Sequence, residues 1–405
     1  MQIRSATDDD RDVFDRTMHT AFGRFPEPAI DGGGLWWSAL DMDRCLLAYA
    51  DDGRPVGTAG AHTFELTLPG EAIAPAAGVT AVAVLPTHRR QGVLTAMMGH
   101  QLADLRARGK FLAVLLASEA PIYGRYGFGP ATYTAELTVE RHQSALTAGR
   151  APGAPAPHTG SIEVLPRDDC GDLLEELYDR YRRRQPGALS RPPQWWARRA
   201  GQPPISPAPR FIALHRDANG APDGYASYSP RESGSITVDE IITADDATFT
   251  ALARFAFEHD LSTRTLIKHV PTGHPLRWQL ADFRGGQVGD DTDWLWVRIL
   301  DIPRALTTRG WFADGELVLD VADPFLHERH RYLLSADDGK ARCTPTDRAP
   351  DLSLDIRDLG SIYLGGTTPS TLIRAGHIRA HTPEAAARAD ALFRSDRTPH
   401  CLHWF

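Results

Sequence analysis

Hydrophobic and polar positions divide the first part of the chain into alternating strand-like and helix-like stretches. Residues 1–22 begin with a short strand pattern and continue with apolar side chains at helical spacing. Residues 44–69 carry two apolar runs around the turn sequence Asp-Asp-Gly, which predicts a hairpin. The β-branched run 78–85 predicts a strand, the apolar residues of 94–105 recur with the period of a helix, and 111–118 reads as a buried strand. This order predicts a mixed α/β domain.

The pattern then repeats in outline. A Pro-, Gly- and Ala-rich stretch at 147–160 predicts a linker. Beyond it, a helical pattern at 173–184, a hairpin pattern at 210–228 and a strand-then-helix pattern at 238–257 follow in the earlier order. The corner between strand and helix differs, because the second copy has Asp-Asp-Ala-Thr at 245–248. We therefore expect one fold used twice, with chemistry only in the first copy.

The composition is that of a globular protein long enough for two or three domains, with 405 residues, 42% of them hydrophobic and 24% charged. With 44 basic and 52 acidic residues the formal net charge is −8, so neither nucleic acid nor an anionic membrane is expected as a partner. No window approaches 18 uninterrupted apolar residues, and the N-terminus lacks the apolar core of a signal peptide. Four scattered cysteines predict no disulfide framework and no metal site, and they fit a cytoplasmic protein.

The corner after the strand at 78–85 carries the first chemical signal. Arg89, Arg90, Gln91 and Gly92 stand where the helix begins. A helix N-terminus has free N–H groups and about half a positive charge, and glycine lets a ligand approach the backbone closely. Two guanidinium groups add permanent charge. The corner suits a pyrophosphate; the alternative is a capped helix with solvated arginines.

The order strand, "RRQGV", helix, strand and tyrosine-containing turn resembles motif A of the GCN5-related N-acetyltransferases (GNAT). In that motif Q/R-x-x-G-x-G/A binds the pyrophosphate of acetyl-CoA. The last small residue of the motif is replaced here by Leu94.

A narrower resemblance covers nearly the whole chain. "VAVLPTHRRQGVLTAMM", "ASEAPIYGRYGFGPAT", "CTPTDRAPDLSLDIRDLGSIYLGG" and a terminal Phe are similar to the Eis (enhanced intracellular survival) family of N-acetyltransferases. The resemblance implies tandem GNAT-fold domains, a catalytic one at 1–150 and one without a cofactor motif at 161–296. A sterol-carrier-protein-like α+β domain with a catalytic C-terminus would follow at 297–405. It also implies a homohexamer.

The same resemblance assigns residues to acetyl-CoA. The main chain of the strand end would pair with the pantetheine arm, the corner and first helical turn would cradle the pyrophosphate, and the end of the next strand would lie beside the cofactor. These residues are Val82, Ala83, Val84, Arg89, Arg90, Gln91, Gly92, Val93, Leu94, Thr95, Ser118 and Glu119. The group that polarises the thioester carbonyl is either the N–H of Val82 or a neighbouring one.

Transfer of an acetyl group to an amine needs a proton donor for the thiolate and a proton acceptor for the amine. The donor matches Tyr123, with Tyr126 as the rival; the alternative for both is aromatic packing. The acceptor implied by the family is the terminal carboxylate of Phe405, buried together with Trp404. With pKa values of about 3.5 and about 10.4, direct transfer from an ammonium is uphill by about 9 kcal/mol. The proton therefore travels through water or leaves after the amine has attacked.

The identity of the amine substrate is the part of the function that the sequence determines least. Aromatic and acidic side chains line the pocket in family members that acetylate aminoglycosides. The matching candidates here are Phe22, Arg24, Trp36, Trp37 and Trp404. Arg24 and Trp404 fall where the family has acids, which weakens attraction to a polycation. An aminoglycoside and a less cationic amine both stay open as substrates. A lipid or ligand carrier with a vestigial acyltransferase domain is the alternative function.

Overall fold

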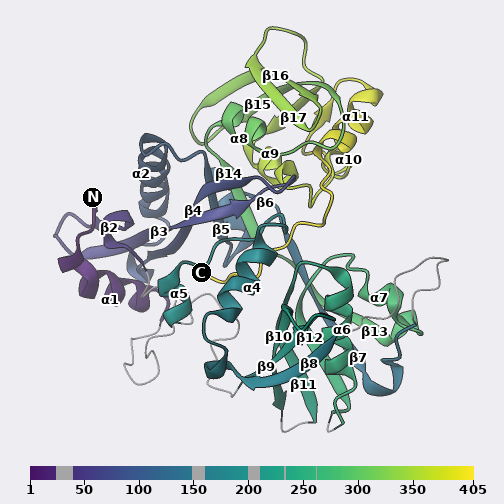
Figure 1. Cartoon of the computed structure of the whole chain (residues 1–405). Helices are drawn as coiled ribbons and strands as arrows, with labels where there is room; N and C mark the ends of the chain where they lie inside the picture. Colours follow the sequence, from purple (N-terminus) through teal and green to yellow (C-terminus); the bar gives the residue numbers. More distant parts are fainter. Residues whose placement is uncertain (24–39, 148–159, 199–209, 232–233, 261) are drawn as a thin grey trace.

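The computed structural model describes residues 1–23, 40–147, 160–198, 210–231, 234–260 and 262–405. Three sheets organise three domains, with the third domain uppermost in Figure 1 and the second below. Two domains with a similar order of strands and helices, followed by an α+β domain, agree with the predicted architecture.

Seven strands build the sheet of the first domain. Their order is β1 (Gln2–Ser5), β2 (Leu46–Tyr49), β3 (Pro55–Thr67), β4 (Ile73–Val84), β5 (Leu112–Leu116), β14 (Leu295–Ile299) and β6 (Gly129–Pro130). Helix α1 (Arg11–Ala21) and helix α2 (Val93–Ala107) cover opposite faces. Successive side chains of β2 point to opposite faces of the sheet, and Leu47 packs with α1 whereas Ala48 packs with α2.

The sheet of the second domain repeats this arrangement. Its order is β13 (Gly286–Asp293), β7 (Tyr133–Glu140), β12 (Arg264–Pro271), β11 (Ser235–Thr243), β10 (Pro222–Arg231), β9 (Phe211–Arg216) and β8 (Ser161–Pro166). The helices are α4 (Leu173–Arg182), α5 (Pro193–Arg198), α6 (Asp246–Phe257) and α7 (Leu276–Gln279). By order along the chain, β11, α6 and β12 correspond to β4, α2 and β5.

The two domains exchange strands. Strand β7 lies inside the range 1–150 but pairs with β12 and β13 of the second sheet. Strand β14 spans the expected boundary at 296 and pairs with β5 and β6 of the first sheet. Strand pairing therefore crosses both expected boundaries, and local sequence pattern does not reveal such pairing.

The third domain packs helices against a five-stranded sheet. The strand order is β17 (Lys340–Pro345), β16 (Glu328–Asp337), β15 (Gly315–Asp323), β18 (Leu352–Asp355) and β19 (Arg379–Ala380). The helices are α8 (Ile302–Thr308), α9 (Ile356–Tyr363), α10 (Pro369–Arg374) and α11 (Pro383–Phe393). In the described part of the chain, no helix has both the length and the apolar character that a membrane crossing requires.

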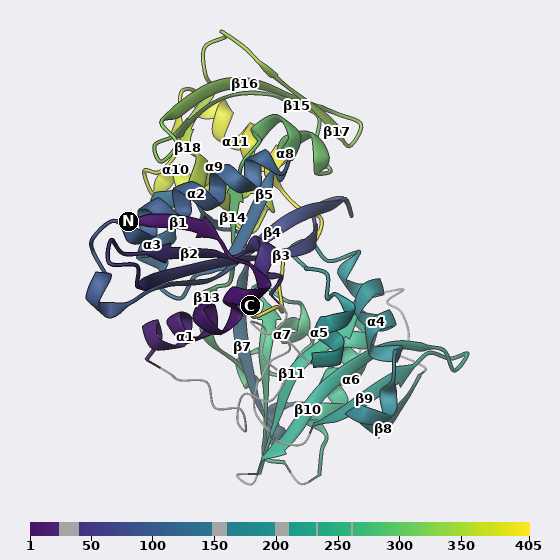
Figure 2. The same ribbon diagram turned by 90° about the vertical axis from the view of Figure 1, so that its left-hand side faces the viewer.

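The last residues form a tail without helix or strand. Residues 394–405 leave the third domain after α11, pass the second domain and end beside the first sheet (Figures 1 and 2). Most side chains near its end are buried, including Cys401, Leu402 and His403. The tail therefore connects all three domains.

Candidate active site

The first sheet opens between β4 and β5. The two strands are parallel but pair only where residues 77–78 lie beside 113–114. Strand β5 then stays with β14 along its whole length, whereas β4 stays with β3. At Ala81, whose φ is 52°, β4 carries a bulge that bends it further. The carboxyl ends of two parallel strands thus separate, which is where ligands of open α/β sheets bind.

A cleft of about 580 Å³ fills this opening. It is lined by Ala21, Phe22, Val82, Ala83, Val84, His88, Arg89, Arg90, Gly92, Val93, Leu94, Thr95, Ser118, Glu119, Ile122, Tyr123, Arg125 and Tyr126. The lining includes three arginines against one carboxylate, so the cleft favours an anionic ligand. Arg125 is a cation that the sequence motif did not single out.

The structure brings together almost all residues that the sequence assigns to the cofactor. Gln91 is the exception: it does not line the cleft, and its amide donates to the carbonyl oxygen of Thr87 at 3.1 Å. The side chain of Gln91 therefore braces the corner from outside, and only its backbone belongs to the turn.

The corner exposes the N-terminus of α2. Gly92 caps the helix with φ 83°, and no side chain caps the first turn. The N–H of Ala96 donates to the carbonyl oxygen of Gly92 at 3.0 Å. Arg90 has φ 63°, a left-handed conformation that non-glycine residues rarely adopt. The N–H groups of this first turn and the positive end of the helix face the cleft, which fits a phosphate group.

Arg89 has a structural part in the same corner. Its Nε donates to the carbonyl of Val84 at 3.2 Å, and its Nη2 donates to that of Ala21 at 2.9 Å. Arg89 therefore ties the end of α1 to the end of β4 and brings charge to the cleft from a fixed position.

Tyr123 ends the short helix α3 (Ala120–Tyr123) inside the cleft. Burial raises the pKa of Tyr123 to about 12, while a hydrogen bond with Ser118 opposes that shift. Because Ser118 lies two residues after the end of β5, it orients the phenol where the two strands part. The phenol is protonated throughout the neutral range.

Tyr126 also lines the cleft, but its hydroxyl is engaged differently. It lies 3.2 Å from Oγ1 of Thr95 in the first turn of α2. Its ring packs edge-on against Phe325 of the third domain, with centroids 5.0 Å apart. Tyr126 thus fastens α2 to the third domain, which favours Tyr123 as the proton donor of the two.

The chain terminus lies at the same opening but on the other face of the sheet. The Phe405 ring is 7% exposed and packs 5.1 Å from the ring of Phe64 on β3. A Cβ added to Gly78 would lie 3.1 Å from Phe405 and collide with Phe64. Gly78 is the last residue of β4 that pairs with β5. The terminus therefore reaches the point where the strands separate.

The expectation that Trp404 is buried with Phe405 is wrong, since Trp404 is 44% exposed. In an extended segment neighbouring side chains point to opposite sides, so His403 and Phe405 face the protein and Trp404 faces outward. Among the other predicted substrate residues, Phe22 lines the cleft at its rim and is 58% exposed. Arg24, Trp36 and Trp37 lie outside the described residues.

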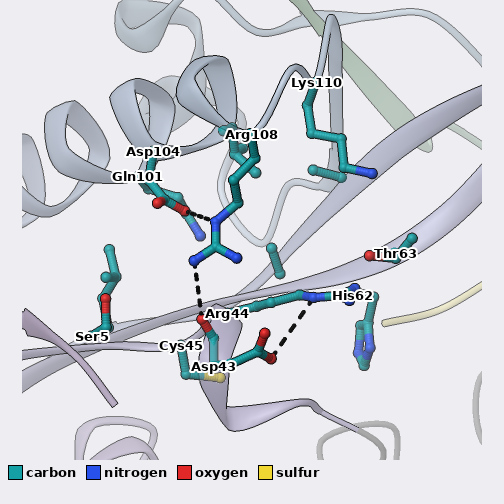
Figure 3. A pocket seen from close by; sticks show the side chains of 14 residues that line it. Ser5, Asp43, Arg44, Cys45, His62, Thr63, Gln101, Asp104, Arg108 and Lys110 are labelled. Carbon is teal, nitrogen blue, oxygen red and sulfur yellow. Dashed lines mark hydrogen bonds and ion pairs between the residues drawn. The ribbon is translucent and has the colours of Figure 1, made fainter. Parts of the chain in front are cut away.

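A second cavity of about 240 Å³ lies near the terminus and was not predicted (Figure 3). His62 separates it from Phe405, with ring centroids 6.4 Å apart. Its charged lining residues are Asp43, Arg44, Asp104, Arg108 and Lys110. Cations outnumber anions there, so this cavity does not favour a polycation. No motif could have shown it, because its residues come from five separate segments of the chain.

Comparisons with known proteins define the class. Two models described as acetyltransferase (GNAT) domains match residues 2–131 and 187–299, and a model described as a sterol carrier protein domain matches residues 302–402. A GCN5-related N-acetyltransferase from Anabaena variabilis has the same fold, with a TM-score of 0.82 over 100% of both chains at 19% identity. The chain is therefore a tandem GNAT acetyltransferase with a sterol carrier domain.

Closer relatives define the family. Eis1 from Mycobacterium abscessus superposes with a TM-score of 0.84 and 31% identity over 100% of both chains. The N-acetyltransferase Eis of Mycobacterium tuberculosis is 37% identical over 351 residues, 84% of this chain and 83% of that relative. An uncharacterized N-acetyltransferase of Streptomyces griseus is 34% identical over 99% of both chains. The chain belongs to the Eis family of N-acetyltransferases.

Proposed function

We propose that this N-acetyltransferase moves the acetyl group of acetyl-CoA directly to the amine of a small molecule. One observation carries the proposal: the free N-terminal turn of α2 and its cationic corner face a cleft formed by the separation of β4 and β5. This arrangement offers N–H donors and positive charge to a pyrophosphate beside strand backbone that is free to bind an extended chain.

The residues present fit acetyl-CoA. Arg90 and the first turn of α2 would hold the diphosphate, with Arg89 fixed alongside. The free edge of β4 at residues 82–84 would hydrogen-bond the pantetheine arm. Ser118 and Glu119 would flank the thioester at the end of β5.

The transfer forms a C–N bond and breaks a C–S bond, so one proton must leave nitrogen and one must reach sulfur. Tyr123 donates to the departing thiolate; its pKa of about 12 keeps the proton on oxygen until charge develops on sulfur. The terminal carboxylate of Phe405 accepts the proton of the amine. The phenol and the terminal residue are supplied from opposite faces of the sheet, which leaves the opening between them for the reacting groups.

The amine acceptor is the finer part of the proposal. The charged side chains of the second cavity near the terminus favour an amine of low charge, because cations outnumber anions there. A monoamine is therefore preferred here over a polycationic aminoglycoside. The expected homohexamer and cytoplasmic location stay predictions.

The test is thiol release from acetyl-CoA against a panel of mono- and polyamines, with product masses measured in parallel. A gain of one acetyl group on a small amine, dependent on enzyme, supports the proposal. Absence of turnover with every amine, together with stoichiometric lipid after purification, would support the carrier alternative instead.

A further inference from the structure

The second domain keeps a cleft at the position that corresponds to the cofactor cleft. Strands β11 and β12 are parallel and pair only where 235–238 lies beside 264–267. Beyond that point they separate, and β11 carries a bulge at Asp239. Helix α6 begins at the carboxyl end of β11, as α2 begins after β4. A cavity of about 220 Å³ lies in this opening.

At the start of its helix the second cleft carries negative charge, whereas the cofactor cleft of the first domain carries positive charge. Asp245 caps α6 by accepting a hydrogen bond from the N–H of Thr248 at 2.8 Å, and Asp246 follows in the first turn. In the first domain the same corner carries Arg89 and Arg90 and an uncapped turn. Two carboxylates at the helix start repel a pyrophosphate and attract a cation.

The cation that approaches is part of the chain's own tail. Nη2 of Arg397 lies 3.4 Å from the carbonyl oxygen of Ala244 and 3.9 Å from Oδ1 of Asp246. Asp396, Arg397, Thr398 and His400 all line the cavity. The tail thus occupies one side of the cleft that would otherwise be open to a ligand.

Hydrogen bonds to the backbone of the tail hold it more firmly than does the surface ion pair between Arg397 and Asp246. Nε2 of Gln185, which is buried, donates to the carbonyl of Thr398 at 2.8 Å. The N–H of His400 donates to the carbonyl of Pro186 at 2.8 Å. Gly187, with φ 89°, lets this contact form, because a Cβ there would lie 3.1 Å from the nitrogen of His400.

Hydrogen bonds to the tail continue as far as His403, two residues before the terminus. The indole N–H of Trp294 donates to the carbonyl of His403 at 2.9 Å. Nδ1 of His403 lies 3.2 Å from the hydroxyl of Tyr178 on α4. Tyr178 is itself covered by Arg191, which pairs with Glu240 of β11 at 2.8 Å in the protein interior.

We propose that the second domain acts as a holder for the C-terminal tail. Its cofactor-like cleft and the adjoining α4 region bind residues 396–403 and thereby set the position of the Phe405 carboxylate in the first domain. Gln185 and Trp294 are positioning residues, since they touch the tail and not the reacting groups. The inference rests on the proposed role of Phe405 as base.

The experiment removes single hydrogen-bond donors to the tail while leaving an apolar side chain at each position. Gln185→Leu and Trp294→Phe each delete one N–H donor to a tail carbonyl. Gln279→Leu is the matched control, because this glutamine accepts from Thr250 within the second domain and does not touch the tail. Two readouts are taken on the full chain: release of the last residues by a carboxypeptidase, and kcat and KM with acetyl-CoA.

We expect carboxypeptidase release to quicken about five-fold in each tail variant, the effect of one lost hydrogen bond on the open population. kcat should fall as well, because a loosened tail positions the Phe405 carboxylate less precisely, while KM for acetyl-CoA stays unchanged, a split that general destabilisation would not produce. The control variant Gln279→Leu should match the wild type in both carboxypeptidase release and kcat. Calorimetry should find one coenzyme A per chain.

The proposal is overturned if both tail variants behave like Gln279→Leu in release and in kcat, or if two molecules of coenzyme A bind per chain. Should Gln185→Leu fail to fold, Trp294→Phe still decides. The release assay needs no catalysis, so it tests the binding of the tail separately from the proposed role of Phe405 as base. Faster release with unchanged kcat would keep the tail-holding contacts but remove Phe405 from the chemistry.

Discussion

The tail should open as the pH falls, and His400 allows the size of this effect to be worked out. His400 is 3% exposed, and burial, together with His269 and His274 nearby, lowers its pKa to about 3. Other titratable groups that line the same cavity are Tyr181, Asp245, Asp246, Asp396 and Arg397. A histidine in water has a pKa of about 6.5.

The sign follows from which state takes the proton. When the tail is open, His400 is protonated as the pH falls through 6.5; when the tail is docked, it stays neutral down to about pH 3. The stability that the neutral imidazole contributes is therefore fully present above 6.5 and is lost between 6.5 and 3. Through His400 alone, the open population should be about 30-fold larger at pH 5 than at pH 7.5, or about 2 kcal/mol. Burial also lowers the pKa of His403, so this second tail histidine acts in the same direction.

Hydrogen exchange resolved to peptides of residues 396–405 measures this opening, after correction for the intrinsic pH dependence of exchange. His400→Gln keeps a neutral polar side chain and removes the titration. We expect the rise in exchange between pH 7.5 and pH 5 to be smaller in the variant by about 30-fold. An equal rise in wild type and variant would refute the argument, because the proton uptake would then belong to another group.

Three further predictions concern the cofactor cleft and the terminus. Tyr123→Phe should lower kcat by about a hundredfold or more while KM for acetyl-CoA is retained, and an equally active variant would remove Tyr123 from the mechanism. Because burial raises the pKa of Tyr123 to about 12, the wild type should lose no activity from this group between pH 8 and pH 10. Arg90→Ala should raise KM for acetyl-CoA about ten-fold through the loss of a charged donor, and an unchanged KM would contradict the phosphate cradle. A short Gly-Ser extension after Phe405 should abolish turnover while calorimetry still detects coenzyme A; full activity of the extended chain would exclude the terminal carboxylate as base.

Local pattern was enough to predict the elements that carry the site. The strand at 78–85, the helix start after Gly92 and the strand at 111–118 all depend on periodicity and a few residues with special backbone preferences. The cleft lies where these three elements meet, and the family resemblance carried by the same residues named most of its lining. The repeated order of the second domain was visible for the same reason.

Features that depend on distant partners could not be predicted in this way. The exchange of β7 and β14 between sheets is a matter of long-range pairing, which periodicity does not encode. The outward side chain of Trp404 depends on how an irregular tail turns as it docks. The carbonyls that Arg89 binds, from Ala21 and Val84, come together only in the folded domain.

The two clefts show how one fold can serve two purposes after a small change in charge. In both, a bulged strand parts from its parallel neighbour and a helix begins at the opening. With arginines and an uncapped turn, the opening attracts a diphosphate; with Asp245 and Asp246, it attracts the guanidinium of Arg397. A tail used as a catalytic group must be held in place, because a free terminus would lose conformational entropy each time it entered the site. In our proposal, the second domain meets that need with the same backbone geometry that the first would use for its donor. The change from a cofactor cleft to a tail-binding cleft would thus couple the second copy to control of the terminus.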